Sequence, residues 1–206
     1  SPYYSWGIYL DLSCSGYHVH DNVVYNTYYA GFVIGGGQDN VFENNIFVGG
    51  QVSQGWFCPW LKPARNHHFP MERNRIERNI FAYDGPNSLY FTTWTFDNKF
   101  ATFKDNLIFN AGGPIQVGLG DFKGDFSSWE HWTKTLGQDQ GSVIADPLFV
   151  DAKNHDYRLK KDSPAFKIGF KAIDLSTVGN YKSAERYSWP RPEAKVYREK
   201  PITNVN

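Results

Sequence analysis

The stretch Val41-Phe42-Glu43-Asn44-Asn45-Ile46-Phe47 recurs with variations three more times along the chain. The four copies align on the asparagines Asn22, Asn45, Asn79 and Asn106. Each copy has an apolar residue three positions before its asparagine, a polar residue two positions before it and an apolar residue directly after it. Such alternation is typical of a strand with one buried face. The sequence therefore predicts repeated short strands.

The distances between these asparagines are 23, 34 and 27 residues. A shortest period in the low twenties with irregular insertions is typical of a solenoid, and helical solenoids need longer repeats. The repeats are rich in Val, Ile, Phe, Tyr, Asn and Gly, which favours strands and tight turns. We therefore predict an all-β chain folded as a parallel β-helix. The asparagines are expected to adopt a left-handed turn conformation and to hydrogen-bond to one another as a ladder.

The pattern divides the chain into three parts. Residues 1–120 are predicted to form β-helix coils, with a long loop at 50–72, and residues 121–180 a C-terminal closing module. This module is expected to contain a short helix between Ser127 or Ser128 as the N-cap and Gly137 as the stop. Residues 181–206 are Pro-rich and predicted to be an extended surface tail. The chain begins in mid-pattern, and one hypothesis is that it is part of a longer protein, whose missing N-terminal part would be its partner.

The composition excludes some classes of function. Lys plus Arg and Asp plus Glu number 21 each, so the net charge is zero, which argues against a nucleic-acid partner. No apolar run approaches the length of about 18 residues expected of a membrane span, and no signal peptide is visible. Aromatic residues make up 17% of the chain, which suits a large β core or a surface that stacks on sugars. Cys14 and Cys58 are consistent with one disulfide or with two reduced thiols.

Several stretches resemble the right-handed parallel β-helix proteins of carbohydrate metabolism. They are Trp6-Gly7-Ile8-Tyr9-Leu10-Asp11, the repeats at Asn22–Asn26 and Glu43–Phe47, and the downstream segments Leu136–Asp139, Ala145–Asp151, Asp156–Leu159 and Asp162–Gly169. The chain is most similar to glycoside hydrolase family 141, which includes fucosidase and xylanase activities, and more distantly to the β-xylosidases of family 120. The resemblance covers roughly residues 6–180, and it implies a right-handed parallel β-helix. The predicted fold is thus such a β-helix (solenoid) with the short helix and the extended C-terminal tail described above.

The resemblance also implies a catalytic position. In the xylosidase-type members, the aspartate that matches Asp11 is the nucleophile, and a glutamate on the next coil is the acid. Ile34 occupies the position that matches this glutamate. If Asp11 is catalytic, its partner must lie further along the chain, and Asp84, Asp97 and Glu72 are candidates. Asp84 and Asp97 are also typical turn residues, and Glu72 lies in a charged run that suits a solvated face.

Candidate substrate-binding residues are aromatic, or lie in the predicted long loop. They are Tyr9, Trp56, Trp60, Arg65, His67, His68, Tyr90 and Trp94. The tryptophans suit stacking on sugars or anchoring the loop, and the Arg–His group suits binding of a sugar or a carboxylate. His18 and His20 share a strand face but lack a third ligand, so no metal site is predicted.

The leading functional hypothesis is a secreted or periplasmic glycoside hydrolase that acts on a plant or algal polysaccharide or its oligosaccharides without a cofactor. A second hypothesis is a polysaccharide lyase that cleaves a uronate-containing glycan by β-elimination. Lys62, Arg65 and His67 are its candidate residues, and Ca²⁺ or an arginine would neutralise the uronate. A third is a non-catalytic, glycan-binding or structural protein. No nucleic-acid or membrane partner is expected under any of the three.

Overall fold

The structure is a computed structural model that describes residues 5–59, 70–120 and 126–175. The chain divides into two compact units, Ser1–Ile173 and Asp174–Asn206. All the strands and helices given below belong to the first unit. The predicted tail at 181–206 lies outside the described residues. The predicted boundaries at 120 and 180 stay predictions.

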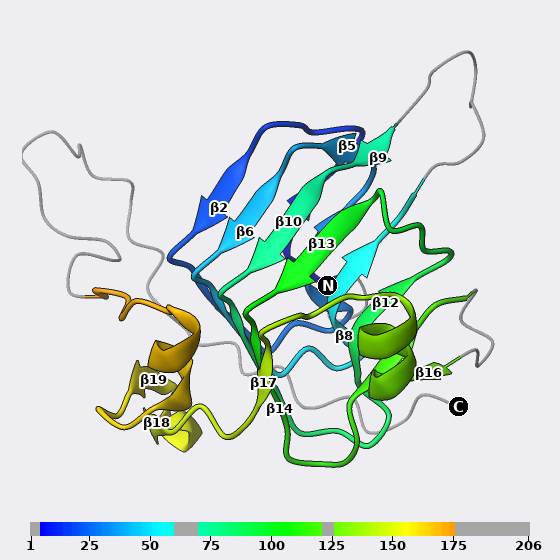
Figure 1. The fold of residues 1–206 in the computed structure, drawn as a ribbon. Helices are drawn as coiled ribbons and strands as arrows, with labels where there is room; N and C mark the ends of the chain where they lie inside the picture. The colour runs from blue at the N-terminus through cyan, green and yellow to red at the C-terminus, as the bar shows by residue number, and fades with distance from the viewer. Residues whose placement is uncertain (1–4, 60–69, 121–125, 176–206) are drawn as a thin grey trace, which may run out of the picture. The chain divides into compact units, whose positions relative to one another are not determined.

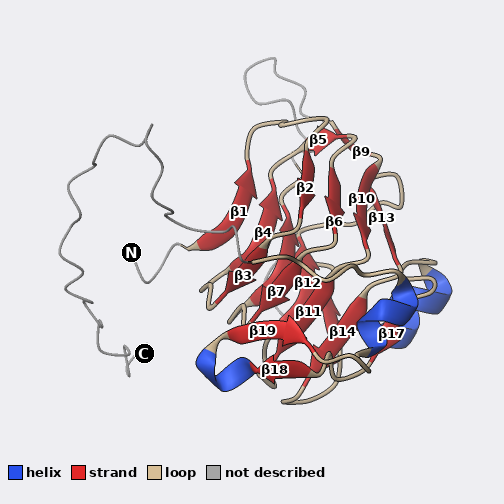
Figure 2. Cartoon of the chain, turned by 90° about the vertical axis from the view of Figure 1, so that its left-hand side faces the viewer, coloured by secondary structure: helices blue, strands red, loops and turns tan. Residues whose placement is uncertain are grey.

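Most strands lie in three large sheets, to each of which successive repeats contribute a strand (Figures 1 and 2). The six-stranded sheet has the order β1 (Trp6–Leu10), β4 (Ala30–Ile34), β8 (Ser53–Phe57), β12 (Leu89–Thr93), β15 (Gln116–Gly118) and β16 (Phe126–Ser128). The four-stranded sheet has the order β13 (Ala101–Lys104), β10 (Asn74–Glu77), β6 (Val41–Glu43) and β2 (His18–His20). The five-stranded sheet has the order β17 (Val143–Ile144), β14 (Leu107–Asn110), β11 (Ile80–Tyr83), β7 (Ile46–Val48) and β3 (Val23–Tyr25).

Smaller elements complete the described part. Strand β5 (Gly37–Gln38) pairs with β9 (Met71–Glu72), and β18 (Phe149–Asp151) pairs with β19 (Asp156–Leu159). The short helices are η1 (His131–Thr135), η2 (Ala152–Asn154) and η3 (Pro164–Ile168). The helix expected at 127–137 is present as η1: the Ser128 hydroxyl accepts a hydrogen bond from the His131 N–H at 3.2 Å, and Gly137 follows with φ 68°.

The structure corrects the predicted fold class. The strands lie in five separate sheets, which are not closed on one another. The sheets also differ in kind, because β15–β16 and β18–β19 are antiparallel whereas the other pairs are parallel. The prediction of one right-handed parallel β-helix solenoid is therefore wrong, and the chain has a β-rich fold of several parallel and mixed sheets with few helices.

The physical reason for the separate sheets is a left-handed corner in each repeat. Asp21, Asn44, Arg78 and Asp105 have φ between 52° and 57°, and each directly precedes a ladder asparagine. This conformation ends a strand of the four-stranded sheet and starts the next strand in the five-stranded sheet. The prediction that the ladder asparagines themselves adopt the left-handed conformation is wrong by one position, because their side chains point inward to make hydrogen bonds.

These inward side chains form a continuous ladder. Asn22, Asn45 and Asn79 each donate from Nδ2 to Oδ1 of the next asparagine in the series, at 2.9, 3.0 and 3.2 Å. Asn106 donates in the same way to Asp139 Oδ1 at 3.0 Å. The ladder satisfies polar groups that the three sheets bury between them, and it provides the asparagine-to-asparagine bonds that the repeat predicted.

The apolar core follows the alternation of the repeats. Phe42, Ile76 and Phe103 are register partners on β6, β10 and β13, and all three are buried. Their rings and methyl groups pack with inward residues of the other two large sheets, including Phe32 and Phe81. The high aromatic content therefore supplies a large β core.

The stretch predicted as a long loop at 50–72 contains two strands. Ser53–Phe57 is β8, which pairs with β4 on one side and β12 on the other. Met71–Glu72 is β9, and residues 60–69 lie outside the described residues. The loop prediction is wrong at β8. Ser53, Gln54 and Gly55 are not apolar, so this strand shows no alternation of apolar and polar residues. Gln54 is nevertheless buried, and its side chain donates a hydrogen bond to Ser88 Oγ.

Candidate functional site

The candidate site begins where β1 ends. Leu10 points into the core, whereas Tyr9 is 47% exposed and Asp11 is exposed, as the alternation predicted. The Asp11 carboxylate accepts a hydrogen bond through Oδ1 from the Leu12 N–H at 2.9 Å. Leu12 and Ser13 then turn the chain with φ 46° and 66°. The carboxylate is thereby held at the corner between two sheets.

The neighbours of Asp11 on the next two strands are not carboxylates. Leu10 pairs with Ile34, and Ile34 with Phe57, so the residues level with Asp11 are Gly35 and Cys58. The prediction that Ile34 occupies the slot next to Asp11 is wrong by one residue; Ile34 is fully buried in the core. A Cβ atom at Gly35 would lie 3.0 Å from Asp11 Oδ1, so glycine lets the strand approach this carboxylate closely.

The electrostatics of this corner depend on Asp11. Partial burial raises the pKa of Tyr9 to about 12, and the charge of Asp11 and a hydrogen bond to its carboxylate add to this effect. Burial also raises the pKa of the Cys58 thiol to about 12, again with a contribution from the charge of Asp11. Tyr9 and Cys58 therefore stay protonated at neutral pH. Both cysteines are free, so Cys14 and Cys58 form no disulfide with each other.

Cys58 is expected to react slowly with alkylating reagents. Its pKa is raised from 9.0 to about 12, so its thiolate fraction near pH 8 is lower by roughly a thousandfold than that of an ordinary thiol. We expect Asp11→Asn to speed the alkylation of Cys58 by iodoacetamide, because the variant removes a negative charge beside the thiol. Mass spectrometry of the modified peptide measures this rate. An unchanged rate in Asp11→Asn would contradict the proximity of the two groups, and Asp97→Asn is the matched control.

A series of aromatic rings lies beside Asp11. The Trp6 ring centroid is 5.2 Å from that of Tyr9 and 5.4 Å from that of Tyr29, and the Tyr29 and Trp56 centroids are 5.7 Å apart. Trp6 and Tyr9 belong to β1, Tyr29 precedes β4 and Trp56 belongs to β8. Tyr9 offers the most exposed ring of the series, and Trp56 is largely buried. Trp94, directly after β12, is 38% exposed.

The structure does not bring the three candidate catalytic aspartates together. Asp97 follows β12, which is three strands from β1 in the same sheet, or about 14 Å at the usual strand spacing. Asp97 Oδ1 instead accepts a hydrogen bond from the Lys99 N–H at 3.0 Å, as a turn residue does. Asp84 follows β11 in the five-stranded sheet and lines a separate pocket. Asp11 is therefore the only one of the three at the aromatic face.

Tyr90, a predicted substrate-binding residue, and Glu72, a candidate catalytic partner of Asp11, do not lie beside Asp11. Tyr90 is 1% exposed and donates from its hydroxyl to Asp139 Oδ1 at 3.2 Å, so the prediction that it binds substrate is wrong. It occupies an inward position of β12. Glu72 belongs to β9 and pairs with Arg73 at 3.0 Å. Trp60, Lys62, Arg65, His67 and His68 lie outside the described residues, and their predicted roles stay predictions.

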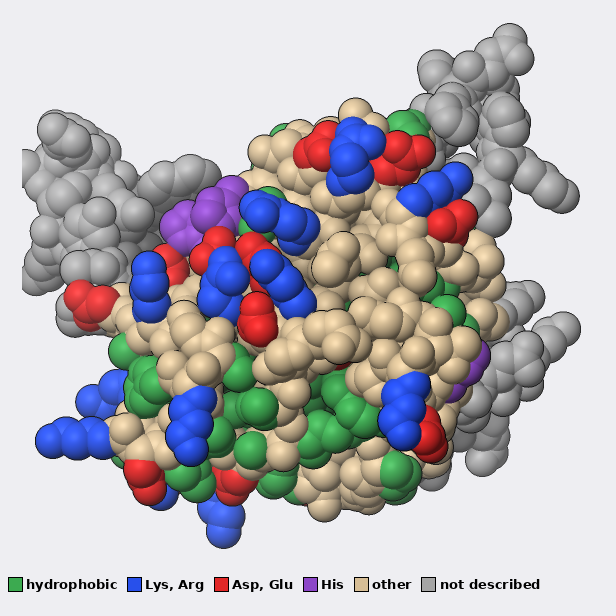
Figure 3. All heavy atoms as spheres, viewed as in Figure 1, with side chains coloured by type: hydrophobic (Ala, Val, Ile, Leu, Met, Phe, Trp, Pro, Cys, Tyr) green, Lys and Arg blue, Asp and Glu red, His purple; other side chains and the backbone are tan. Residues whose placement is uncertain are grey.

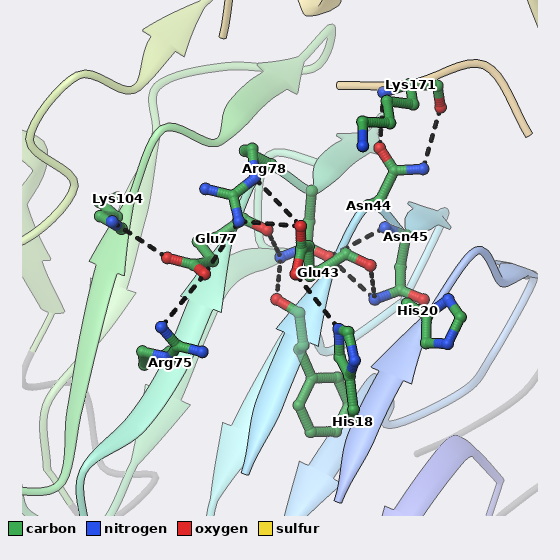
Figure 4. A network of polar contacts seen from close by, with 12 residues as sticks. His18, His20, Glu43, Asn44, Asn45, Arg75, Glu77, Arg78, Lys104 and Lys171 are labelled. Carbon is green, nitrogen blue, oxygen red and sulfur yellow. Dashed lines mark hydrogen bonds and ion pairs between the residues drawn. The ribbon is translucent and has the colours of Figure 1, made fainter. Parts of the chain in front are cut away.

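A charged network covers the four-stranded sheet (Figures 3 and 4). Its centre is Glu77 on β10, which is only 2% exposed. Three cations surround this carboxylate: Arg78 at 2.9 Å, Lys104 at 3.2 Å and Arg75 at 3.8 Å. Removal of one of these cations would leave a buried carboxylate with less compensation for its lost hydration.

Glu43 extends the network to the neighbouring strand. Its carboxylate lies 2.9 Å from Arg78 Nη2 and 3.2 Å from His18 Nε2, and the hydrogen bond from Arg78 is the main reason that the pKa of Glu43 is lowered. Sequence reasoning could have found this network, because His20, Glu43, Glu77 and Lys104 share the same outward slot of the repeat. Two carboxylates and three Lys or Arg side chains form the network, so it leaves one net positive charge on the outer surface of the sheet.

Within residues 5–59, 70–120 and 126–175, no group of three or more His, Cys, Asp or Glu side chains is placed to hold a metal ion. Among the helices described, none has the length and apolar character to cross a membrane.

Comparisons with known proteins give one curated relative. It is the "Uncharacterized protein YwoF" of Bacillus subtilis (strain 168), which is 28% identical to the chain over 153 residues. The matched region covers 71% of this chain but 31% of that protein, so the chain corresponds to about a third of the relative's length. No protein-family model and no solved structure matches the chain.

Proposed function

We propose that this protein is a carbohydrate-active protein that holds a glycan on the outward face of β1, β4 and β8 and hydrolyses it, with Asp11 as one catalytic carboxylate. The observation that supports this is the placement of Asp11 beside the half-exposed ring of Tyr9, at the end of the aromatic series. Among the described residues, no Lys or Arg forms an ion pair with Asp11. Its carboxylate is thus available to a ligand.

The chemistry of the face suits a sugar. A pyranose ring has apolar C–H faces that pack on aromatic rings, and hydroxyl groups that donate to carboxylates. A carboxylate beside the anomeric carbon also stabilises the positive charge that develops during glycoside hydrolysis. Tyr9 provides the ring, and Asp11 provides the charge.

The proposal constrains the second catalytic group. Gly35 and Cys58 are level with Asp11 on the next two strands, so this column lacks the second carboxylate at about 5–5.5 Å that a retaining enzyme needs. Cys58 stays protonated and does not replace it. The second catalytic group must therefore be a residue that is not level with Asp11 on the neighbouring strands, or a residue in a loop.

Asp11→Asn is expected to reduce hydrolysis by about 100-fold to 10,000-fold, because the amide cannot stabilise positive charge or transfer a proton. The assay is the release of reducing ends from a panel of plant and algal polysaccharides. Asp97→Asn is the matched control, since Asp97 is an exposed aspartate on a turn three strands away, and it should retain full activity. Thermal unfolding of both variants should match that of the parent protein.

The same panel separates the alternatives. Full hydrolytic activity of Asp11→Asn would overturn the assignment of Asp11. Products with unsaturated, ultraviolet-absorbing ends would show a lyase in place of a hydrolase. Binding of a polysaccharide that weakens in Tyr9→Ala without any cleavage would show a glycan-binding protein.

A further inference from the structure

A pocket of about 540 Å³ lies on the outward face of the five-stranded sheet, against the segment that contains β18. Val48, Ala82 and Phe109 on β7, β11 and β14 are register partners, and all three line this pocket. Ala82 has only a methyl group between the larger side chains of Val48 and Phe109. The small side chain therefore leaves a hollow in the sheet surface, and the volume falls within the range of small-molecule sites.

The wall opposite the sheet is held in place by hydrogen bonds within its own segment. The Ser163 hydroxyl donates to the Pro147 carbonyl at 2.7 Å, and the Lys160 N–H donates to the Leu148 carbonyl at 3.0 Å. Behind the wall, an apolar cluster joins this segment to the sheet; its buried members are Ile46, Ile80, Leu107, Tyr157, Ala165, Ile168 and Phe170. The pocket is thus formed before any ligand binds, which reduces the entropic cost of binding.

Charged side chains that lack charged partners line the pocket. Asp84 and Asp146 form no ion pair with any described Lys or Arg, and Lys160 forms none with a described Asp or Glu. Asp146 Oδ1 accepts a hydrogen bond from the Leu148 N–H at 2.8 Å. The exposed amide residues Asn26 and Gln51 also line the pocket. Two carboxylates and one ammonium leave one net negative charge.

We propose that this pocket binds one neutral sugar unit. Carboxylates and amides bind sugar hydroxyls, and the rings of Phe109 and Phe149 provide apolar surface for the C–H face of a sugar. The net negative charge disfavours uronates and sugar phosphates. Asp11, Tyr9 and the other rings of the aromatic face do not line this pocket, so it is a second site, and binding there does not require the function proposed for Asp11.

Ligand-observed NMR with the methyl glycosides of xylose, fucose, galactose and glucose tests the proposal. We expect at least one of them to bind. Its affinity should fall at least tenfold in Asp84→Asn/Asp146→Asn, because charged acceptors bind hydroxyls more tightly than amides do. Ala82→Leu, which fills the hollow, should have the same effect. Asp162→Asn changes an exposed aspartate of the same segment outside the pocket and should leave the affinity unchanged.

The two sites are distinguished by their own variants. Asp11→Asn should leave this binding unchanged, whatever it does to hydrolysis. If Ala82→Leu does not fold, the double aspartate variant decides, because both of its side chains are exposed. The proposal is overturned if none of the four glycosides binds, if binding survives the double substitution, or if methyl glucuronide or spermidine binds in their place.

Discussion

Asn79→Ala is expected to lower the free energy of unfolding by about 4 kcal/mol, because the substitution leaves several buried groups without partners. Asn79 is fully buried. Its Nδ2 donates to the carbonyls of Phe42 and Glu77 at 2.9 and 3.0 Å, and its Oδ1 accepts from the Asn45 N–H at 3.0 Å. Alanine removes all of these bonds together with the two side-chain bonds to the flanking ladder members.

Asn22→Ala is the matched control for this prediction. Asn22 is the first ladder asparagine and only half-buried, and its Nδ2 donates to the His20 carbonyl and to Asn45 Oδ1. Water can replace some of these bonds, so we expect a loss of about 1 kcal/mol. Urea unfolding followed by circular dichroism measures both variants. Equal losses at Asn22 and Asn79 would contradict the view that burial sets the strength of the ladder.

Asp139→Asn is expected to destabilise the fold by about 3 kcal/mol. The buried carboxylate accepts four hydrogen bonds, from Trp132 Nε1 at 2.7 Å, Ser142 Oγ at 2.6 Å, Asn106 Nδ2 at 3.0 Å and the Tyr90 hydroxyl. An amide in either orientation directs its NH₂ group at one or more of these donors, which leaves them unsatisfied. Calorimetric or urea unfolding measures the loss. Asp105→Asn, at a left-handed corner that asparagine tolerates, should change stability by less than about 1 kcal/mol.

The pH dependence of this loss has a defined sign. Burial raises the pKa of Asp139 above its ordinary value of 3.8, against the effect of its four hydrogen bonds. The folded state therefore binds the proton more tightly than the unfolded state. Burial of the charged Asp139 carboxylate lowers the stability of the fold at a pH above the raised pKa. This loss of stability disappears as the pH falls through the raised pKa towards 3.8, because the carboxylate becomes protonated. The stability difference between the parent protein and Asp139→Asn should consequently widen as the pH is lowered. A difference that narrows over this window would contradict the raised pKa.

Local periodicity predicted the strands of the four-stranded and five-stranded sheets, because the alternation recurs around each ladder asparagine. Tyr9 and Asp11 were placed on the outside of β1 by the same reasoning. Periodicity was not sufficient where a shift of one residue decides which face of a strand a side chain occupies. Gly35, and not the predicted Ile34, lies beside Asp11, which is a shift of one position along β4. Tyr90 points inward because its hydroxyl donates a hydrogen bond to Asp139, which is 49 residues away in the sequence.

The candidate sites were predicted less completely. The charged network around Glu77 was visible as a polar column, but its pairing with Arg78 depends on the left-handed corner that brings neighbouring residues together. The pocket beside Ala82 could not be predicted, since Asp84 and Asp146 line one pocket only because the segment that contains Asp146 packs on the sheet.

The sequence by itself determined the strands around each ladder asparagine, the buried faces of those strands and the asparagines that bond from one repeat to the next, because these follow from a pattern that recurs locally along the chain. Only the tertiary structure decided how the strands divide among five sheets, that Asp139 completes the ladder, and that Asp84 and Asp11 belong to different sites. These features depend on left-handed corners and on packing between distant segments, and residue periodicity contains no information about such long-range contacts.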